Sequence, residues 1–282
     1  ALARAAAALF SLVSSTGCAL VPVADHRPDA LHLAAPRVEI PLVDGAWGPH
    51  VLARLDGTAP RRVLVDTGAN VVLVSPEVAE ALGLGGLGLP RSVGGPEGAR
   101  WRWVPSGTLE SVDLGDGAAR LLGLDYWVLD FPSDADGLLG LPAFADTLLT
   151  IDRPRGRLVL EHGSLPEPDG VTVLPYHLAD GIPYVHVRVA GVGFEVAVDS
   201  GYAGALSVPA DVAADLPWSD DTGGDVVAES VHGSSVARWR LLGAPLEVGR
   251  HRLTNVPAMI DDGAPLLGDV ILRNFTVTFD QQ

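Results

Sequence analysis

An internal duplication constrains the fold of this chain more than any other feature of its sequence. Residues 50–84, HVLARLDGTAPRRVLVDTGANVVLVSPEVAEALGL, have the same pattern as residues 184–216, YVHVRVAGVGFEVAVDSGYAGALSVPADVAADL. Each segment predicts an alternating strand, a glycine-containing turn, a second apolar strand ending in Asp-Thr/Ser-Gly, a short strand and a helix that begins near a proline. Two halves that repeat the same elements are expected to fold as two similar lobes.

The duplication continues beyond these segments. SVGGPEGARWRW at 92–103 aligns without a gap with SVHGSSVARWRL at 230–241. Each half then reaches two leucines and a glycine, at 138–140 and at 266–268, and an aspartate follows each glycine at the same spacing. The repeat therefore extends to the end of both halves.

The short strands and frequent turns predict an all-β fold made of two pseudo-symmetric β-barrel lobes with few short helices and a cleft between the lobes. The 33 glycines, 22 prolines and 48% hydrophobic residues suit such a turn-rich globular protein. Residues 163–174, rich in glycine, proline and acid, are expected to be the linker. We predict a first lobe at 37–165 and a second lobe at 166–282.

Charge and motif content exclude several function classes. The formal net charge of −16 disfavours a phosphate-binding surface, so nucleic acid is not an expected partner. The chain has eight histidines without paired ligand spacing and one cysteine, which predicts no metal site. The G-x-G-x-x-G pattern at 83–88 follows an expected helix, whereas a dinucleotide site needs it before one. We expect a flexible loop there and no cofactor.

The N-terminal segment predicts export. Residues 1–18 contain one arginine, a short apolar run and small residues before Cys18. This segment resembles a bacterial lipoprotein signal, which would make Cys18 a lipidation site; an ordinary cleaved signal is the alternative. Residues 19–36 would then be a tether. The expected location is the periplasm or the outer membrane facing an extracytoplasmic space, with membrane contact only through the lipid anchor.

Two aspartates stand at equivalent places in the repeat. Asp66 and Asp199 each end an apolar strand and begin an Asp-Thr/Ser-Gly triplet. A single triplet is more often a turn, because aspartate and glycine commonly follow strands. Two copies, each followed by the apolar pair and glycine at a similar distance, indicate a paired site instead.

Over residues 37–282 the arrangement resembles the pepsin and retropepsin superfamily of aspartic proteases, and it looks like a retropepsin dimer fused into one chain. The resemblance implies that Asp66 and Asp199 face each other and hold one water. It also implies supporting roles for the other triplet residues: hydrogen bonds across the junction for two of them and close backbone approach for the glycines. These supporting residues are Thr67, Gly68, Ser200 and Gly201.

The second pair of repeats, 92–103 and 230–241, falls where that family has flaps over the cleft. The candidate flap or substrate-binding residues are Gly94, Gly95, Trp101, His232, Gly233 and Trp239. The alternative for the two tryptophans is packing of the flap base against each lobe, and for the histidine a solvated loop position. Neither flap carries the tyrosine that pepsins have, so a pepsin-like substrate clamp is not expected.

The resemblance implies a monomeric aspartic endopeptidase that acts on a peptide or protein substrate. Two adjacent carboxylates share one proton, so one would act as base toward water and the other as acid toward the carbonyl oxygen. Tyr202 stands where the family usually has a small residue. Two alternatives remain open: a non-catalytic periplasmic binding or scaffold protein that retains the fold, and an enzyme with one dedicated substrate that undergoes regulated self-processing.

Overall fold

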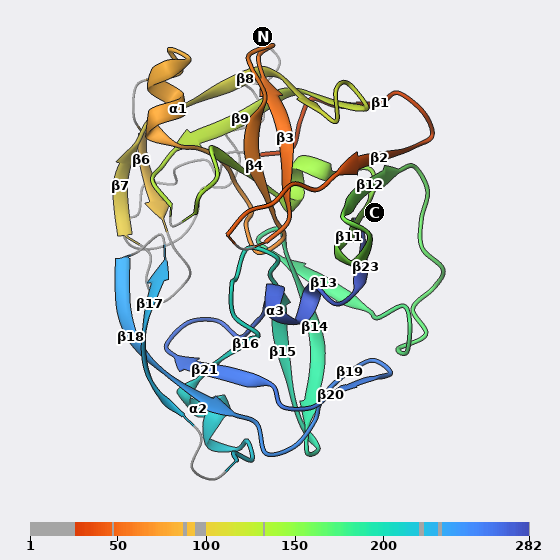
Figure 1. Cartoon of the computed structure of the whole chain (residues 1–282), viewed down its shortest axis with the longest axis vertical. Helices are drawn as coiled ribbons and strands as arrows, with labels where there is room; N and C mark the ends of the chain where they lie inside the picture. Colours follow the sequence, from red (N-terminus) through yellow and green to blue (C-terminus); the bar gives the residue numbers. More distant parts are fainter. Residues whose placement is uncertain are drawn as a thin grey trace, which may run out of the picture.

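The structure is a computed structural model whose elements are almost all β-strands, with three short α-helices in the described part of the chain (Figure 1). This confirms the predicted all-β fold class. Residues 1–18 with Cys18, and the start of the tether, lie outside the described residues. The described ranges are 26–46, 48–86, 89–93, 100–131, 133–219, 223–230 and 233–281.

Strands of the first half form a seven-stranded sheet, hereafter the first lobe. The order is β1-β9-β5-β10-β4-β3-β8, and β8 also pairs with β9, so six of the strands close into a barrel. Closure leaves few free strand edges. The strands are β1 (Ala30–Leu33), β3 (His50–Leu55), β4 (Arg61–Asp66), β5 (Val72–Val74), β8 (Ser106–Leu114), β9 (Ala119–Val128) and β10 (Gly137–Gly140).

Strands of the second half form a ten-stranded sheet, hereafter the second lobe. Its order is β17-β18-β21-β16-β22-β15-β14-β19-β20, with β13 pairing with β14. The strands are β13 (Tyr176–Ala179), β14 (Ile182–Val189), β15 (Val192–Val198), β16 (Leu206–Pro209), β17 (Gly224–Ser230), β18 (Gly233–Leu241), β19 (Leu246–Val248), β20 (His251–Leu253), β21 (Pro257–Asp261) and β22 (Leu266–Leu267).

Five strands of each lobe have the same order and directions. The series β3-β4-β10-β5-β9 of the first lobe corresponds to β14-β15-β22-β16-β21 of the second. In both series the first pair is antiparallel, the second parallel, the third antiparallel and the fourth parallel. Equivalent sequence segments therefore occupy equivalent places in the two lobes.

A short helix follows β5 in the first half, α1 (Pro76–Ala81), and another follows the equivalent strand β16 in the second half, α2 (Ala210–Ala214). The Ser75 side chain caps α1 by accepting from the Val78 N–H, and Pro76 occupies the first turn, where a missing N–H costs nothing. In α2 a proline, Pro209, stands at the capping position instead. Local sequence thus starts both helices beside a proline.

A third sheet contains strands from both halves of the chain. Its antiparallel order is β2 (Arg37–Pro41), β12 (Arg157–Glu161), β11 (Leu148–Asp152) and β23 (Thr276–Asp280). The last strand of the chain thereby pairs with β11, and the hydroxyls of Thr150 and Thr278 are 2.8 Å apart across this pair. We call it the joining sheet, since it ties the C-terminal strand to the first half.

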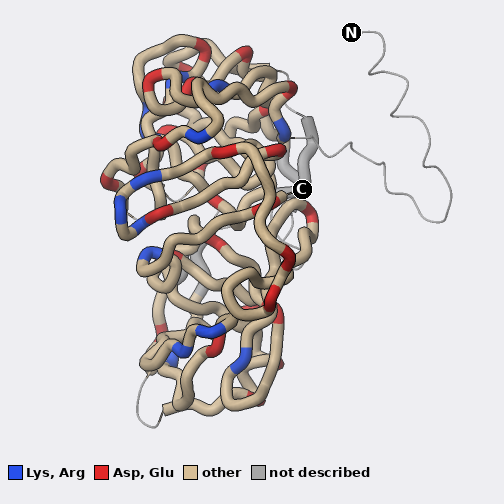
Figure 2. Tube along the Cα trace, turned by 90° about the vertical axis from the view of Figure 1, so that its right-hand side faces the viewer, with Lys and Arg blue, Asp and Glu red and all other residues tan. Residues whose placement is uncertain are grey.

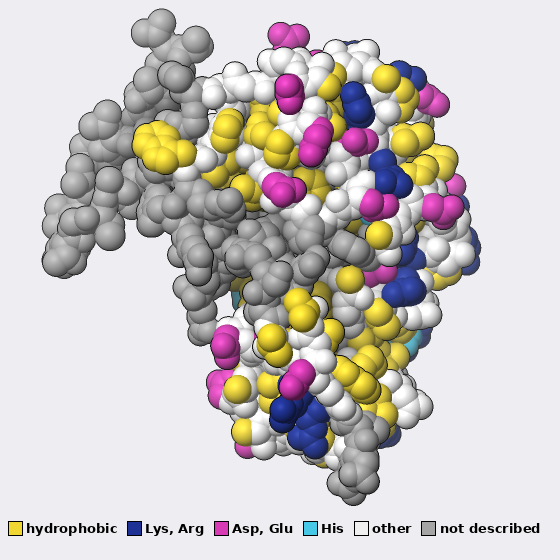
Figure 3. Space-filling view, turned by 60° about the vertical axis from the view of Figure 1, so that its left-hand side comes forward, with side chains coloured by type: hydrophobic (Ala, Val, Ile, Leu, Met, Phe, Trp, Pro, Cys, Tyr) yellow, Lys and Arg dark blue, Asp and Glu magenta, His cyan; other side chains and the backbone are white. Residues whose placement is uncertain are grey.

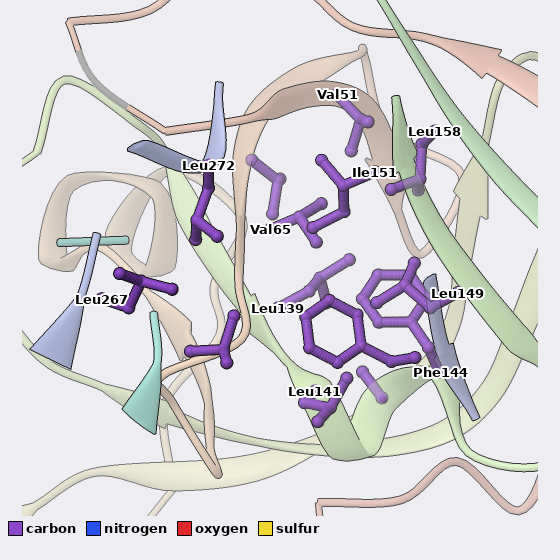
Figure 4. Packing of buried hydrophobic residues seen from close by; sticks show 14 of the residues in the cluster. Val51, Val65, Leu139, Leu141, Phe144, Leu149, Ile151, Leu158, Leu267 and Leu272 are labelled. Carbon is purple, nitrogen blue, oxygen red and sulfur yellow. The ribbon is translucent and has the colours of Figure 1, made fainter. Parts of the chain in front are cut away.

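The hydrophobic core is continuous between the halves. Leu267 and Leu272 of the second half belong to the same cluster as Leu139, Phe144 and Leu149 of the first, and Figure 4 shows them beside one another. Such burial, at about 25 cal/mol per Å² of apolar surface, is the main favourable contribution to folding. The two halves consequently share one core beneath the ends of β4 and β15.

Charged residues are distributed along the whole trace, with acidic residues more frequent than basic ones (Figure 2). Both acidic and basic side chains reach the surface on the face shown in Figure 3. In the described ranges, no helix is long and apolar enough to cross a membrane.

One buried carboxylate, that of Asp152, anchors the joining sheet. Its oxygens accept from Thr276 Oγ1 at 2.7 Å, from Arg157 Nε at 2.9 Å and from Arg155 Nη1 at 3.2 Å. Burial alone would raise the pKa of Asp152, but the hydrogen bonds from Thr276, Arg157 and Arg155 outweigh it and lower the pKa to about 2. The charged form is therefore the stabilising one.

We expect Asp152→Asn to lower the free energy of unfolding by about 1 to 2 kcal/mol at neutral pH, because it removes a charged acceptor whose arginine partners are partly exposed. The contribution is complete above the unfolded-state pKa of about 3.9 and is lost as the pH falls toward 2. Urea denaturation at pH 7 and pH 2.5 measures both. Exposed Asp116 is the control, and an equal loss in Asp116→Asn would contradict this role for Asp152.

Candidate active site

The two predicted aspartates stand at equivalent strand ends. Asp66 is the last residue of β4 and lies opposite Gly140 of the parallel strand β10. Asp199 directly follows β15, and its N–H donates to Leu267 O of β22 at 2.9 Å. The three residues before each aspartate are buried and apolar, 63–65 in β4 and 196–198 in β15, so each carboxyl emerges where the apolar strand leaves the core.

The structure brings the two carboxyls together. A side-chain hydrogen bond joins Asp66 to Asp199. A Cβ on Gly68 would lie 2.2 Å from Asp199 Cγ, and one on Gly201 would lie 2.5 Å from Asp66 Cγ. Each triplet glycine thus packs against the carboxyl of the opposite lobe, so a side chain at either position would separate the pair.

The environment of the pair favours a protonated state. Burial raises the pKa of Asp66 well above its usual range, and the charge of Asp199 raises it further. Burial also raises the pKa of Asp199, while hydrogen bonds from Asp66 and from backbone N–H groups act in the opposite direction. Both residues are nevertheless partly exposed, so water has access to the carboxyls.

Thr67 and Ser200, both buried, connect the two loops by four hydrogen bonds. Thr67 Oγ1 donates to Val198 O at 2.6 Å and accepts from the Ser200 N–H at 3.0 Å. In the same way, Ser200 Oγ donates to Val65 O at 2.8 Å and accepts from the Thr67 N–H at 3.0 Å. Each hydroxyl therefore bonds both to the strand and to the loop of the other lobe.

The apolar-apolar-glycine segments lie against the loops. A Cβ on Gly140 would come within 2.5 Å of Ala69 O, and one on Gly268 within 2.4 Å of Gly204 O. Backbone bonds complete the contact: Leu141 N–H donates to Ala69 O at 3.1 Å, and Gly268 N–H to Ala205 O at 2.9 Å. Only glycine fits where the supporting strand passes so close to the loop.

Both predicted flap segments contain antiparallel hairpin strands, and Figure 1 places them on the same side of the molecule. The first hairpin pairs β6 (Leu89–Val93) with β7 (Arg100–Val104), and the second pairs β17 with β18. Gly94, Gly95 and His232 lie outside the described residues, as does the side chain of Trp101, whose backbone is in β7. Gly233 begins β18.

Tryptophan exposure differs between the hairpins. Trp239 is 39% exposed and lies opposite Gly224, while Trp103, which the sequence interpretation passed over, is 76% exposed. Val236 on β18 is equally exposed. Figure 3 shows that hydrophobic side chains reach the surface on this side of the molecule. The exposure of Trp103 makes it a further contact candidate.

An ion pair behind the loops was not predicted from the sequence. Arg153, in a short 3-10 turn (Arg153–Arg155) after β11, has its Nε 3.3 Å from Oδ1 of the buried Asp269 at the start of α3 (Asp269–Leu272). The Asp269 N–H donates to Tyr202 O at 2.8 Å, so the pair supports the second loop. Both side chains line a small cavity together with Thr67 and Ser200. The sequence signal that could have indicated this ion pair is Asp269 itself, which directly follows Leu-Leu-Gly. The first half has the apolar Leu141 at that position.

Two motifs were set aside in the sequence analysis as a metal site and a dinucleotide site. In the described part of the chain, no group of histidine, cysteine, aspartate or glutamate side chains has the arrangement of a metal site. The described portion of the 83–88 glycine motif follows α1, and Gly83 adopts φ +65° there. That is the position of a loop after a helix and differs from the strand-to-helix turn of a dinucleotide site.

Part of the first half matches a known protein family. Residues 51–143, which include Asp66 and Gly140, match the aspartyl protease family. Among solved structures, the chain is similar to a retropepsin-like aspartic protease from Rickettsia conorii, with 20% identity and a TM-score of 0.33, over 47% of this chain and 94% of that chain. Comparison with curated proteins found no significant match.

We expect Thr67→Val to lower the free energy of unfolding by at least about 2 kcal/mol, because it leaves Val198 O and the Ser200 N–H buried without their partner. Valine keeps the side-chain volume, which isolates the hydroxyl. Urea denaturation measures the loss, with Thr58→Val as the control at a hydroxyl that makes an exposed hydrogen bond. Equal stability of the two variants would show that the four-bond connection contributes little.

Proposed function

We propose that this chain, whose residues 51–143 match the aspartyl protease family, is an aspartic endopeptidase that hydrolyses peptide bonds with Asp66 and Asp199. The observation that carries the proposal is the hydrogen-bonded pair of partly exposed carboxyls, one from each lobe, each packed against the glycine of the other triplet. Two acids held so close perform chemistry that one acid cannot.

The proposed reaction follows from electrostatics. Two carboxylates in contact cannot both be charged without strong repulsion, so the pair holds one proton over a range of pH. The charged member accepts a proton from a water as that water attacks the peptide carbonyl carbon. The protonated member donates to the carbonyl oxygen as negative charge develops there. Neither step forms a covalent bond between enzyme and substrate.

The surrounding contacts support this chemistry by fixing geometry. The four hydrogen bonds of Thr67 and Ser200 hold the loops before substrate arrives, so little reorganisation is needed during the reaction. The ion pair of Arg153 with Asp269 braces the second loop through Tyr202 O. We infer that the exposed side chains of Trp103 and Trp239 contact the substrate on the hairpin side.

We also propose that the enzyme acts as a monomer and outside the cytoplasm. Both loops come from one chain, which supports a monomer as the active unit. The resemblance of residues 1–18 to an export signal supports action on proteins or peptides outside the cytoplasm.

We expect Asp66→Asn and Asp199→Asn, made singly, each to reduce peptide cleavage by about 10⁴-fold or more, because each removes one member of the acid–base pair while preserving its volume. Cleavage of a peptide library followed by mass spectrometry gives the rates. Asp44→Asn, at an exposed position, is the control. Turnover by Asp199→Asn near the wild-type rate, or no turnover by the wild-type protein on any peptide, would favour the binding or scaffold alternative.

The same variants are expected to unfold at or above the wild-type temperature near pH 7. The folded-state pKa values of both aspartates are raised, so the pair stabilises the fold at low pH and this contribution is lost as the pH rises through those values. Replacing one carboxylate with an amide relieves the repulsion. Calorimetry at pH 4 and pH 7 should show the advantage of each variant only at the higher pH. A lower melting temperature at pH 7 would contradict this.

Wild-type cleavage is expected to have a bell-shaped pH dependence, since only the singly protonated pair is active. EDTA should leave the rate unchanged, and a statine-type transition-state mimic should inhibit. Loss of activity in EDTA that zinc restores would exclude the two-carboxylate mechanism.

A further inference from the structure

We propose that neutral His50 is a positioning residue, which holds a segment of the first half against the second Asp-Ser-Gly triplet, and that protonation of His50 in acid releases this segment. His50 is the first residue of β3. The described residues that lead into it, 44–46, 48 and 49, are hereafter the entry segment. The effect on cleavage rests on the proposed function, whereas the release concerns the structure alone.

The entry segment contacts both active-site loops. Gly48 adopts φ +71°, and a Cβ there would lie 2.8 Å from Ser200 O. Pro49 O accepts from the Val65 N–H at 2.8 Å, and Pro49 lines the small cavity that Thr67 and Ser200 also line. Displacement of this segment would therefore remove a contact of the residue next to each proposed catalytic aspartate.

The imidazole of His50 is enclosed by the entry segment. The residue is completely buried. A Cβ on Gly45 would lie 2.2 Å from His50 Nδ1, so the ring occupies the space that a side chain at position 45 would need. At the other end of the segment, Gly48 O is 3.3 Å from Nδ1, and the Val43 N–H donates to His50 O at 2.8 Å. The ring thus connects the two ends of the entry segment.

The second ring nitrogen faces a carboxylate without a hydrogen bond to any described residue. Nε2 is buried and lies 3.6 Å from Asp134 Oδ1, whereas Asp134 binds the Ala46 N–H at 3.2 Å and Arg62 Nη2 at 3.0 Å. Because Gly48 O is an acceptor, the neutral ring carries its hydrogen on Nδ1 and has only a lone pair on Nε2. A proton on Nε2 would create a donor for Asp134.

The surroundings of His50 act on its charge in both directions. Burial has the largest effect and lowers the pKa of His50 below its usual value. The charge of Asp134 raises the pKa, whereas Arg62 on β4 and Arg153 after β11 lower it. Asp44 takes part through its backbone oxygen, which accepts from Arg62. The closed structure therefore keeps His50 neutral in a range where an exposed histidine is charged.

This difference couples protonation to opening. When the entry segment is displaced, His50 is exposed and regains a pKa of about 6.5. The closed form is fully favoured above that value and loses stability as the pH falls through it, because the open form alone binds the proton. The loss ends below the lowered pKa of the closed form. The charged ring would be drawn toward Asp134 and away from its position between Gly45 and Gly48.

The equivalent position in the second half does not titrate in this range. Tyr184 stands where the first half has His50, and it is partly exposed. Burial raises the pKa of Tyr184 above its usual value, so its hydroxyl stays neutral in acid and at neutral pH. Acid would therefore release only the segment that contacts the second triplet.

Hydrogen exchange of the Val65 N–H measures the release, because its acceptor is Pro49 O. NMR from pH 7 to pH 5 gives its protection factor, which corrects for the intrinsic pH dependence of exchange. We expect a fall of about tenfold per pH unit between the two pKa values of His50. The Leu242 N–H, bonded to Val256 O in the second lobe, is the control amide and should keep its protection. Constant protection of Val65 would overturn the inference.

His50→Gln tests the cause, because an amide does not titrate in this range. His177→Gln is the matched control at an exposed histidine that pairs with Glu195. We expect the protection of the Val65 N–H to become independent of pH in His50→Gln and to fall as in the wild type in His177→Gln. The wild-type fall in His50→Gln would overturn the role of His50.

Asp134→Asn is a second test that keeps the histidine and decides the matter if His50→Gln does not fold. Without the attraction of the carboxylate, the pKa of His50 in the closed form falls further. The protection of the Val65 N–H should then continue to fall to a lower pH than in the wild type. An unchanged range would overturn the coupling between His50 and Asp134.

Peptide cleavage tests the consequence for the active site. We expect the wild-type rate to show an additional loss in acid that follows the protection of the Val65 N–H, and His50→Gln to retain a larger fraction of its pH 7 rate at pH 5. Identical pH profiles would overturn the positioning role.

The exchange measurements need no turnover, so the two proposals fail separately. A protein that cleaves peptides while the Val65 N–H keeps constant protection would retain the endopeptidase function and lose the role of His50. A protein that cleaves no peptide but shows the expected exchange would retain the release and lose the proposed function.

Discussion

The reciprocal hydrogen bonds between Thr67 and Ser200 are the constraint on which the rest of the site depends. Each hydroxyl bonds to the strand carbonyl of the opposite lobe and to the N–H of the other hydroxyl residue. These groups are buried, so separating the lobes would leave four backbone partners unpaired in a poorly solvated place. The two loops therefore hold one relative position, and the distance between the carboxyls follows from it.

Holding two acids together is unfavourable, and other contacts across the halves offset the cost. The joining sheet pairs β23 with β11, and Asp152 binds Thr276 across that pair. The core cluster continues from Phe144 to Leu272. Because these contacts are spread over the junction, repulsion at one point does not open it. A strained arrangement can persist where the surrounding structure over-determines it.

The duplicated scaffold supplies two similar loops, but the proposed reaction needs an acid and a base that differ. The differences lie beside the triplets. Tyr202, whose N–H donates to Asp199 Oδ1, stands where the first half has Ala69. Asp269, which pairs with Arg153, stands where the first half has Leu141. The two loops thus differ locally, while five strands of each lobe keep the same order and directions.

The sequence by itself determined the class of fold and the pair of aspartates brought together. Alternating strands, turns and prolines are local signals, and a repeated triplet is visible without coordinates. Only the tertiary structure decided that β23 joins the first half, that Arg153 reaches Asp269, and that the Tyr202 N–H points at Asp199. Local periodicity reports which face of a strand is buried, but it carries no information about which distant group lies opposite. That choice is made by the packing of the whole chain.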